Sequence, residues 1–73
     1  MGKLRNFSGK ELCSLLEKYR FFVVRQKGSH IIVQKKTSTS TITIPVPDHR
    51  EIKIGTLHSI IRQSQLNRNI FEA

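Results

Sequence analysis

The chain of 73 residues is poor in several features, and each scarcity excludes a class of protein. Its one cysteine, Cys13, allows neither an internal disulfide nor a zinc cluster built on cysteine ligands. No apolar run approaches the roughly 20 residues that cross a bilayer. The first residues, MGKLRNFSGKEL, lack the apolar core of a secretion signal. The sequence therefore predicts a cytoplasmic protein without a membrane segment.

Acidic residues are also scarce. Five Asp and Glu stand against 13 Lys and Arg, which gives a formal charge of +8. In so short a chain this charge favours a polyanionic partner, such as nucleic acid or an anionic membrane surface. A basic surface that is merely solvated is the alternative. The length predicts one small domain over residues 1–73, with no room for a large cofactor.

Two segments have the pattern of amphipathic helices. Ser8 and Glu11 form the S-x-x-E pattern of a capping box, which predicts a helix over residues 9–19. The apolar residues of this helix lie on one face: Leu12, Leu15, Leu16 and Tyr19. A second helix begins near Gly55 and Thr56, and Asn67 is expected to cap a final turn. Its inner face has the same spacing: Leu57, Ile60, Ile61 and Ser64.

Between these helices the pattern is that of strands. Residues 21–27 and 30–36 are rich in Phe, Val and Ile, and the Gly28-Ser29 pair between them reads as a hairpin turn. Residues 41–46 alternate with period 2, and Pro45 suits an edge strand. The order α-β-β-β-α predicts an α+β fold. A three-stranded antiparallel sheet carries both helices on one face and leaves the other face open.

The two-residue turn predicts which side chains share a face. Lys27 lies opposite His30, Arg25 opposite Ile32, and Val24 opposite Val33. The expected core face of the hairpin holds Phe22, Val24, Ile31 and Val33. The expected open face holds Arg25, Lys27, His30 and Ile32, together with Phe21 and Val23.

The open face has the chemistry of a phosphodiester site. Arg25 and Lys27 can hold phosphate oxygens, and a neighbouring imidazole at His30 can accept or donate a proton. These groups suit metal-free cleavage of RNA as well as they suit simple RNA binding, and the residues alone leave both open. Exposed apolar groups on this face can also stack on bases or meet a protein partner.

Other residues extend the candidate RNA-binding surface. Residues 18–36 carry six of the 13 cations and no acid, so we add Lys35 and the turn residues Gly28 and Ser29. His49 either approaches the RNA, serves as a second acid or base, or makes a structural hydrogen bond. The histidines are far apart in sequence and lack the spacing of metal ligands, so we predict no metal site.

Three segments together resemble the HicA toxin family, the small mRNA interferases of HicAB toxin–antitoxin systems. They are FFVVRQKGSHIIVQK, ITIPVPDH and IKIGTLHSIIRQSQL. The resemblance implies a fold like that of double-stranded-RNA-binding domains and metal-independent endoribonuclease activity on mRNA. It also implies that His30 is catalytic and that a HicB-like antitoxin binds the toxin and blocks this histidine.

The chain departs from the family pattern at one position and leaves other functions open. Arg20 stands where family members often have Gly, so we expect the first helix to end differently. A non-catalytic RNA-binding module is one alternative. A pure interaction protein is another, with Phe21, Val23 or Ile32 in contact with its partner.

Overall fold

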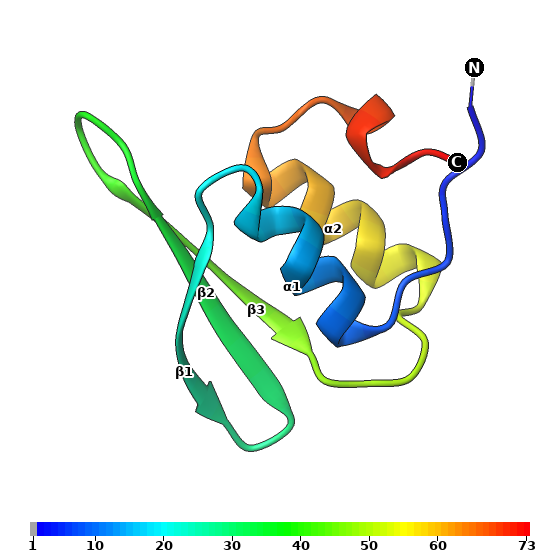
Figure 1. Cartoon of the computed structure of the whole chain (residues 1–73), viewed down its shortest axis with the longest axis horizontal. Coiled ribbons are helices and arrows are strands. Elements are labelled where there is room, and N and C mark those ends of the chain that lie inside the picture. Colours follow the sequence, from blue (N-terminus) through cyan, green and yellow to red (C-terminus); the bar gives the residue numbers. More distant parts are fainter. Residues whose placement is uncertain (1) are drawn as a thin grey trace.

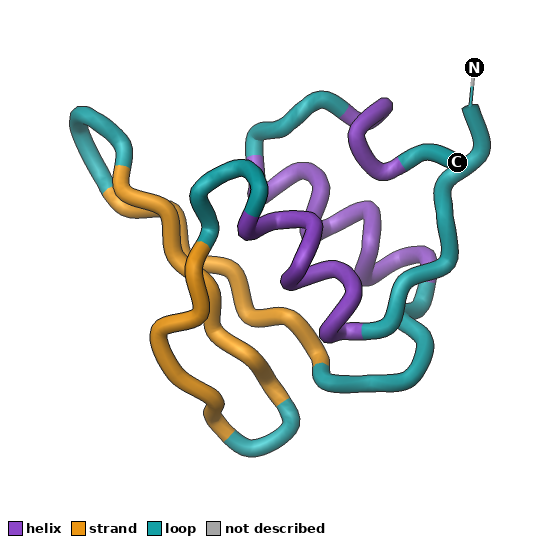
Figure 2. The backbone as a smooth tube through the Cα atoms, viewed as in Figure 1, coloured by secondary structure: helices purple, strands orange, loops and turns teal. Residues whose placement is uncertain are grey.

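The computed structural model describes residues 2–73 and has the predicted α+β order. Its elements are α1 (Gly9–Glu17), β1 (Phe22–Lys27), β2 (His30–Lys36), β3 (Thr41–Pro47), α2 (Ile54–Ser64) and a short 3-10 helix, η1 (Arg68–Phe71). The strands form one antiparallel sheet in the order β1-β2-β3. Both helices cover the same face of this sheet (Figures 1 and 2). The topology fits the arrangement that the resemblance implied.

The capping box at the start of α1 is confirmed. Ser8 Oγ accepts a hydrogen bond of 3.1 Å from the Glu11 N–H, and Glu11 Oε1 accepts one of 2.9 Å from the Ser8 N–H. The bond from the Ser8 N–H, and after it the Ser8 hydroxyl, hold the pKa of Glu11 below its usual value, because both favour the carboxylate. The helix ends at Glu17, two residues before the predicted end.

We expect Ser8→Ala to lower the free energy of unfolding by about 1 kcal/mol, because the helix N-terminus loses an acceptor for its backbone donors. The measurement is urea unfolding followed by circular dichroism. Ser14→Ala is the matched control, since Ser14 is exposed within the same helix. The control should change stability by less than about 0.5 kcal/mol. Equal losses in both variants would contradict a role for the cap.

The prediction that α1 ends differently because of Arg20 is wrong. Arg20 has a left-handed φ of 75°, the conformation in which Gly is favoured. The Phe21 N–H donates to the Leu16 carbonyl and the Arg20 N–H to the Glu17 carbonyl, both at 3.1 Å. This is the Schellman pattern, in which the residue after the left-handed one packs back on the helix. Phe21 is accordingly fully buried, so the prediction that it lies on the open face is wrong.

Arg20→Gly should raise the melting temperature, because glycine removes the steric cost of a left-handed arginine. That cost is about 1 kcal/mol, and the larger backbone entropy of glycine in the unfolded chain offsets part of it. Lys18→Gly is the control. Lys18 has a right-handed helical backbone with φ −63°, so glycine at this position should lower the melting temperature. A fall in melting temperature for both variants would refute this account of the helix end.

The sheet contains an irregularity that the sequence pattern did not indicate. Val23 pairs with Val33 and Arg25 pairs with Ile32, so Val24 is an extra residue in a β-bulge. Three predictions about β1 are therefore wrong. Val24 does not lie opposite Val33, and Phe22 and Val24 are not in the core, since each is 51% exposed. Val23 pairs with a core residue and lines a hollow beside α1, so it lies on the helix side of the sheet and not on the open face.

The other strands follow the predicted alternation. The core face of the sheet carries Ile31, Val33, Ile44 and Val46, all buried, with Ile42 partly buried beside them. Thr41 and Thr43 are exposed, and Pro45 lies in an edge strand as expected. Ile32 lies on the open face but is only 8% exposed, so it is less accessible than predicted.

The second helix and the C-terminal turn close the core from the other side. α2 begins at Ile54 and buries Leu57, Ile60 and Ser64. Asn67 caps η1, and the ring of Phe71 meets that of Phe7 edge-on at 6.3 Å between centroids. No helix within residues 2–73 is long and apolar enough to cross a membrane.

Candidate nucleic-acid interface

The turn between β1 and β2 places His30 as predicted. The loop consists of Gly28 and Ser29, and Lys27 pairs directly with His30. Gly28 has a φ of 59° and Ser29 does not have a positive φ, which is the pattern of a type II′ turn. The predicted opposition of Arg25 and Ile32 is also confirmed. The hairpin therefore presents both cations and the imidazole on the open face of the sheet.

These side chains surround one shallow depression that spans the three strands. Its lining residues are Arg25, Lys27, Gly28, Ser29, His30, Ile32, Thr43 and Pro45. His30 is exposed, whereas Ile32 is nearly buried and forms an apolar floor. None of these lining residues is acidic. The depression thus combines positive charge, one imidazole and an apolar base, which are the groups that a nucleotide chain requires.

Asp48 braces the turn, a role that the sequence did not indicate. Its backbone N–H donates to the Ser29 carbonyl at 2.7 Å. Its Oδ2 accepts a hydrogen bond of 3.3 Å from Gln26 Nε2, and the same nitrogen lies 3.5 Å from the Gly28 carbonyl. The loop after β3 therefore holds the hairpin turn from the side opposite the depression. An Asp or Asn shortly after a strand paired with the hairpin is the only sequence signal that could have suggested this contact.

The loop that carries Asp48 is itself held close to α1. The Gly9 N–H donates to the His49 carbonyl at 2.9 Å. A β-carbon at Gly9 would collide with the Pro47 carbonyl, so only glycine allows this approach. The start of α1 thus fixes the position of the loop, and the loop fixes the turn beside His30.

Two of the predicted RNA-binding residues do not join the depression. Lys35 lies on the helix side of β2, where its ammonium sits 5.6 Å from the centroid of the buried Phe21 ring. His49 is exposed, but it lines a separate hollow with Ser8, Lys10, Asp48 and Arg50. The structure therefore brings together Arg25, Lys27, Gly28, Ser29 and His30, and it leaves Lys35 and His49 apart from them.

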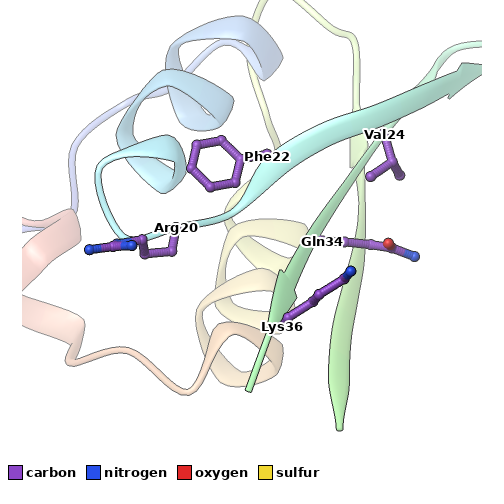
Figure 3. A pocket seen from close by; sticks show the side chains of 5 residues that line it. All are labelled: Arg20, Phe22, Val24, Gln34 and Lys36. Carbon is purple, nitrogen blue, oxygen red and sulfur yellow. The ribbon is translucent and has the colours of Figure 1, made fainter. Parts of the chain in front are cut away.

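A second hollow, which we call the apolar hollow, lies on the same open face. It is lined by Arg20, Phe22, Val24, Gln34 and Lys36 (Figure 3). His30, Ile32, Gln34 and Lys36 occupy every second position of β2, so all four side chains belong to one face of the sheet. The sequence pattern missed this hollow because it assigned Phe22 and Val24 to the core.

Cys13 and His58 line neither the depression around His30 nor the apolar hollow. Burial, and to a smaller extent the negative charge of Asp48, raises the pKa of the Cys13 thiol, which favours its unreactive protonated form. His58 is exposed on α2. Across residues 2–73 no three side chains of the His, Cys, Asp and Glu types gather where they could hold a metal ion.

The fold and the site define a small basic α+β protein with an exposed histidine among cations on an open sheet face. Residues 9–66 match the family described as HicA toxins of bacterial toxin–antitoxin systems. The match covers most of the chain, so the protein belongs to the HicA toxin family and is the toxin of a toxin–antitoxin system, with an antitoxin as its partner. No curated protein and no solved structure matches the chain.

Two glycine variants test the left-handed conformation assigned to Gly28 in the turn beside His30. We expect Gly28→Ala to lower the free energy of unfolding by at least about 1 kcal/mol, because alanine disfavours a positive φ. Gly55→Ala is the control. A β-carbon would meet no atom within 4 Å at either position, but Gly55 lies in α2, where alanine is favoured. Thermal unfolding should show opposite signs, and a stabilised Gly28→Ala would refute the turn assignment.

Proposed function

We propose that the protein is a metal-independent endoribonuclease that cleaves mRNA, with His30 as its general acid or base. The observation that carries the proposal is the shared depression of His30, Arg25 and Lys27. Membership of a toxin family supports it, because degradation of mRNA is a direct way to arrest growth. The proposed place of action is the cytoplasm, where the substrate is translated.

The proposed chemistry is an attack by the ribose on its own phosphodiester. The 2′-oxygen forms a bond to phosphorus while the bond from phosphorus to the 5′-oxygen of the next nucleotide breaks. The imidazole of His30 accepts the 2′-hydroxyl proton or donates a proton to the departing oxygen. The products are a 2′,3′-cyclic phosphate and a 5′-hydroxyl, so the reaction consumes no water and no cofactor at this step.

The neighbouring groups of the depression have roles that follow from their charge and position. Arg25 and Lys27 stabilise the negative charge that grows on the phosphate oxygens in the transition state. Gly28 and Ser29 let the RNA backbone approach the turn, because neither carries a bulky side chain. Lys35 and His49, which lie apart from the depression, are left out of this path.

The proposed partner that controls the activity is a HicB-like antitoxin. Its docking on the open face of the sheet would cover His30 and exclude RNA. The earlier expectation for this contact changes with the structure. Phe21 is buried and Val23 lies on the helix side, so the exposed apolar residues of the open face are Phe22 and Val24 instead.

We expect His30→Ala to reduce the rate of RNA cleavage by at least about 100-fold, because a general acid or base contributes that much. The assay follows a labelled single-stranded RNA by gel electrophoresis in excess chelator. His58→Ala is the matched control, since this histidine is exposed on α2 and should leave the rate unchanged. A 2′-deoxyribose at the cleaved position should block the reaction in the unaltered protein.

Three results would overturn the proposal. Loss of cleavage on chelation would show that a metal ion is required. Full activity of His30→Ala would exclude the imidazole as acid or base. Tight binding to RNA with no cleavage of any strand would instead favour a non-catalytic RNA-binding module.

A further inference from the structure

We propose that the apolar hollow is a subsite for one base and its phosphate in single-stranded RNA. In this subsite Phe22 stacks on the base and Lys36 holds the phosphate. The inference deepens the proposed function, because it extends the RNA path from His30 along the open face of the sheet. It predicts that the protein contacts its substrate at a nucleotide a few positions away from the cleaved bond.

The exposure of Phe22 is the first observation behind the proposal. Its side chain is 51% exposed, and Val24 beside it on β1 is equally so. An aromatic ring left in water beside another apolar side chain is a ready surface for a partner with a flat apolar face. Both residues line the hollow, and Figure 3 shows the ring on the side of β1 nearer Arg20, with Val24 farther along the strand. Every nucleotide base has such a face, so stacking requires no particular sequence.

Charge is the second observation. Lys36 on β2 and Arg20 at the end of α1 flank the two apolar side chains, and no acidic residue lines the hollow. The depression around His30 on the same face adds Arg25 and Lys27. A face that combines these cations with an exposed ring and lacks carboxylates at its two hollows is complementary to a single-stranded polyanion that carries bases.

Gln34 is the third observation, because it lines the same hollow and its amide is held in place. Nε2 donates a hydrogen bond of 3.2 Å to Thr43 Oγ1, the residue that pairs with Gln34 on β3. This bond orients the amide and leaves Oε1 as an acceptor for the edge of a stacked base. Gln34 lies four residues from His30 along β2. The two positions are therefore about 13 Å apart, which separates the subsite from the bond that is cleaved.

The test measures RNA binding without cleavage. The probe is a fluorescent single strand of roughly 12 nucleotides with 2′-O-methyl ribose, which cannot attack its own phosphate. We expect Phe22→Ala to weaken binding about tenfold in fluorescence anisotropy, because one base loses its stacking partner. Phe22→Tyr should retain the affinity. Val23→Ala is the control, since Val23 is 58% exposed but lies on the helix side of the same strand.

A pair of neighbouring lysines tests the phosphate contact. Lys36→Ala should lower the slope of log affinity against log salt by about 0.7, the value for one phosphate contact on a single strand. Lys35→Ala removes the same charge from the adjacent position. The Lys35 side chain packs over Phe21 on the other face of the sheet. It should change the slope much less. Equal changes in the two variants would show that only overall charge matters and would overturn the phosphate contact.

The remaining outcomes separate this inference from the proposed function. Unchanged RNA affinity in Phe22→Ala overturns the base subsite. If the same variant instead weakens the complex with the co-expressed antitoxin, the hollow is a protein-docking surface. Failure of His30→Ala to lose cleavage overturns only the mechanism, because the anisotropy comparison uses an RNA that cannot react by 2′ attack.

Discussion

The open face of the sheet depends on a β-bulge in β1. The bulge is needed because the two ends of this strand require different side-chain alternations. The left-handed backbone at Arg20 turns Phe21 into the core. Strict alternation from Phe21 would then direct Arg25 toward the helices. The Gly28 turn requires Lys27 and Arg25 to share the face of His30. One extra residue, Val24, resolves the conflict as a β-bulge.

The same bulge gives the open face its mixed character. It keeps Phe22 and Val24 on one side of β1 together with Arg25 and Lys27, so that apolar and basic groups line two hollows of a single surface. In a regular strand, either Phe22 and Val24 or Arg25 and Lys27 would face the helices instead of the open face. Bulges are frequent at sheet edges near functional sites, and this one supplies the surface on which both proposals rest.

Support for His30 comes from outside the hairpin. The turn is held by Asp48, whose loop is in turn held against α1 through the backbone of Gly9. Each link is a hydrogen bond or a close backbone approach between segments far apart in sequence. A histidine beside a two-residue turn would otherwise sit at the free end of a hairpin. The bracing instead attaches it to the packed helical layer, which favours a fixed position for the group that we propose to transfer protons.

The sequence by itself determined the element order, the capping box at Ser8, the Gly28 turn and the sharing of one face by Lys27 and His30. These follow from local chemistry and from short periodic patterns. Only the tertiary structure decided that Phe21 is buried while Phe22 is exposed, that Lys35 lies away from His30, and that Asp48 braces the turn. The reason is physical: the bulge at Val24 shifts side-chain alternation by one residue, and the contacts that fix the two ends of β1 come from other parts of the fold.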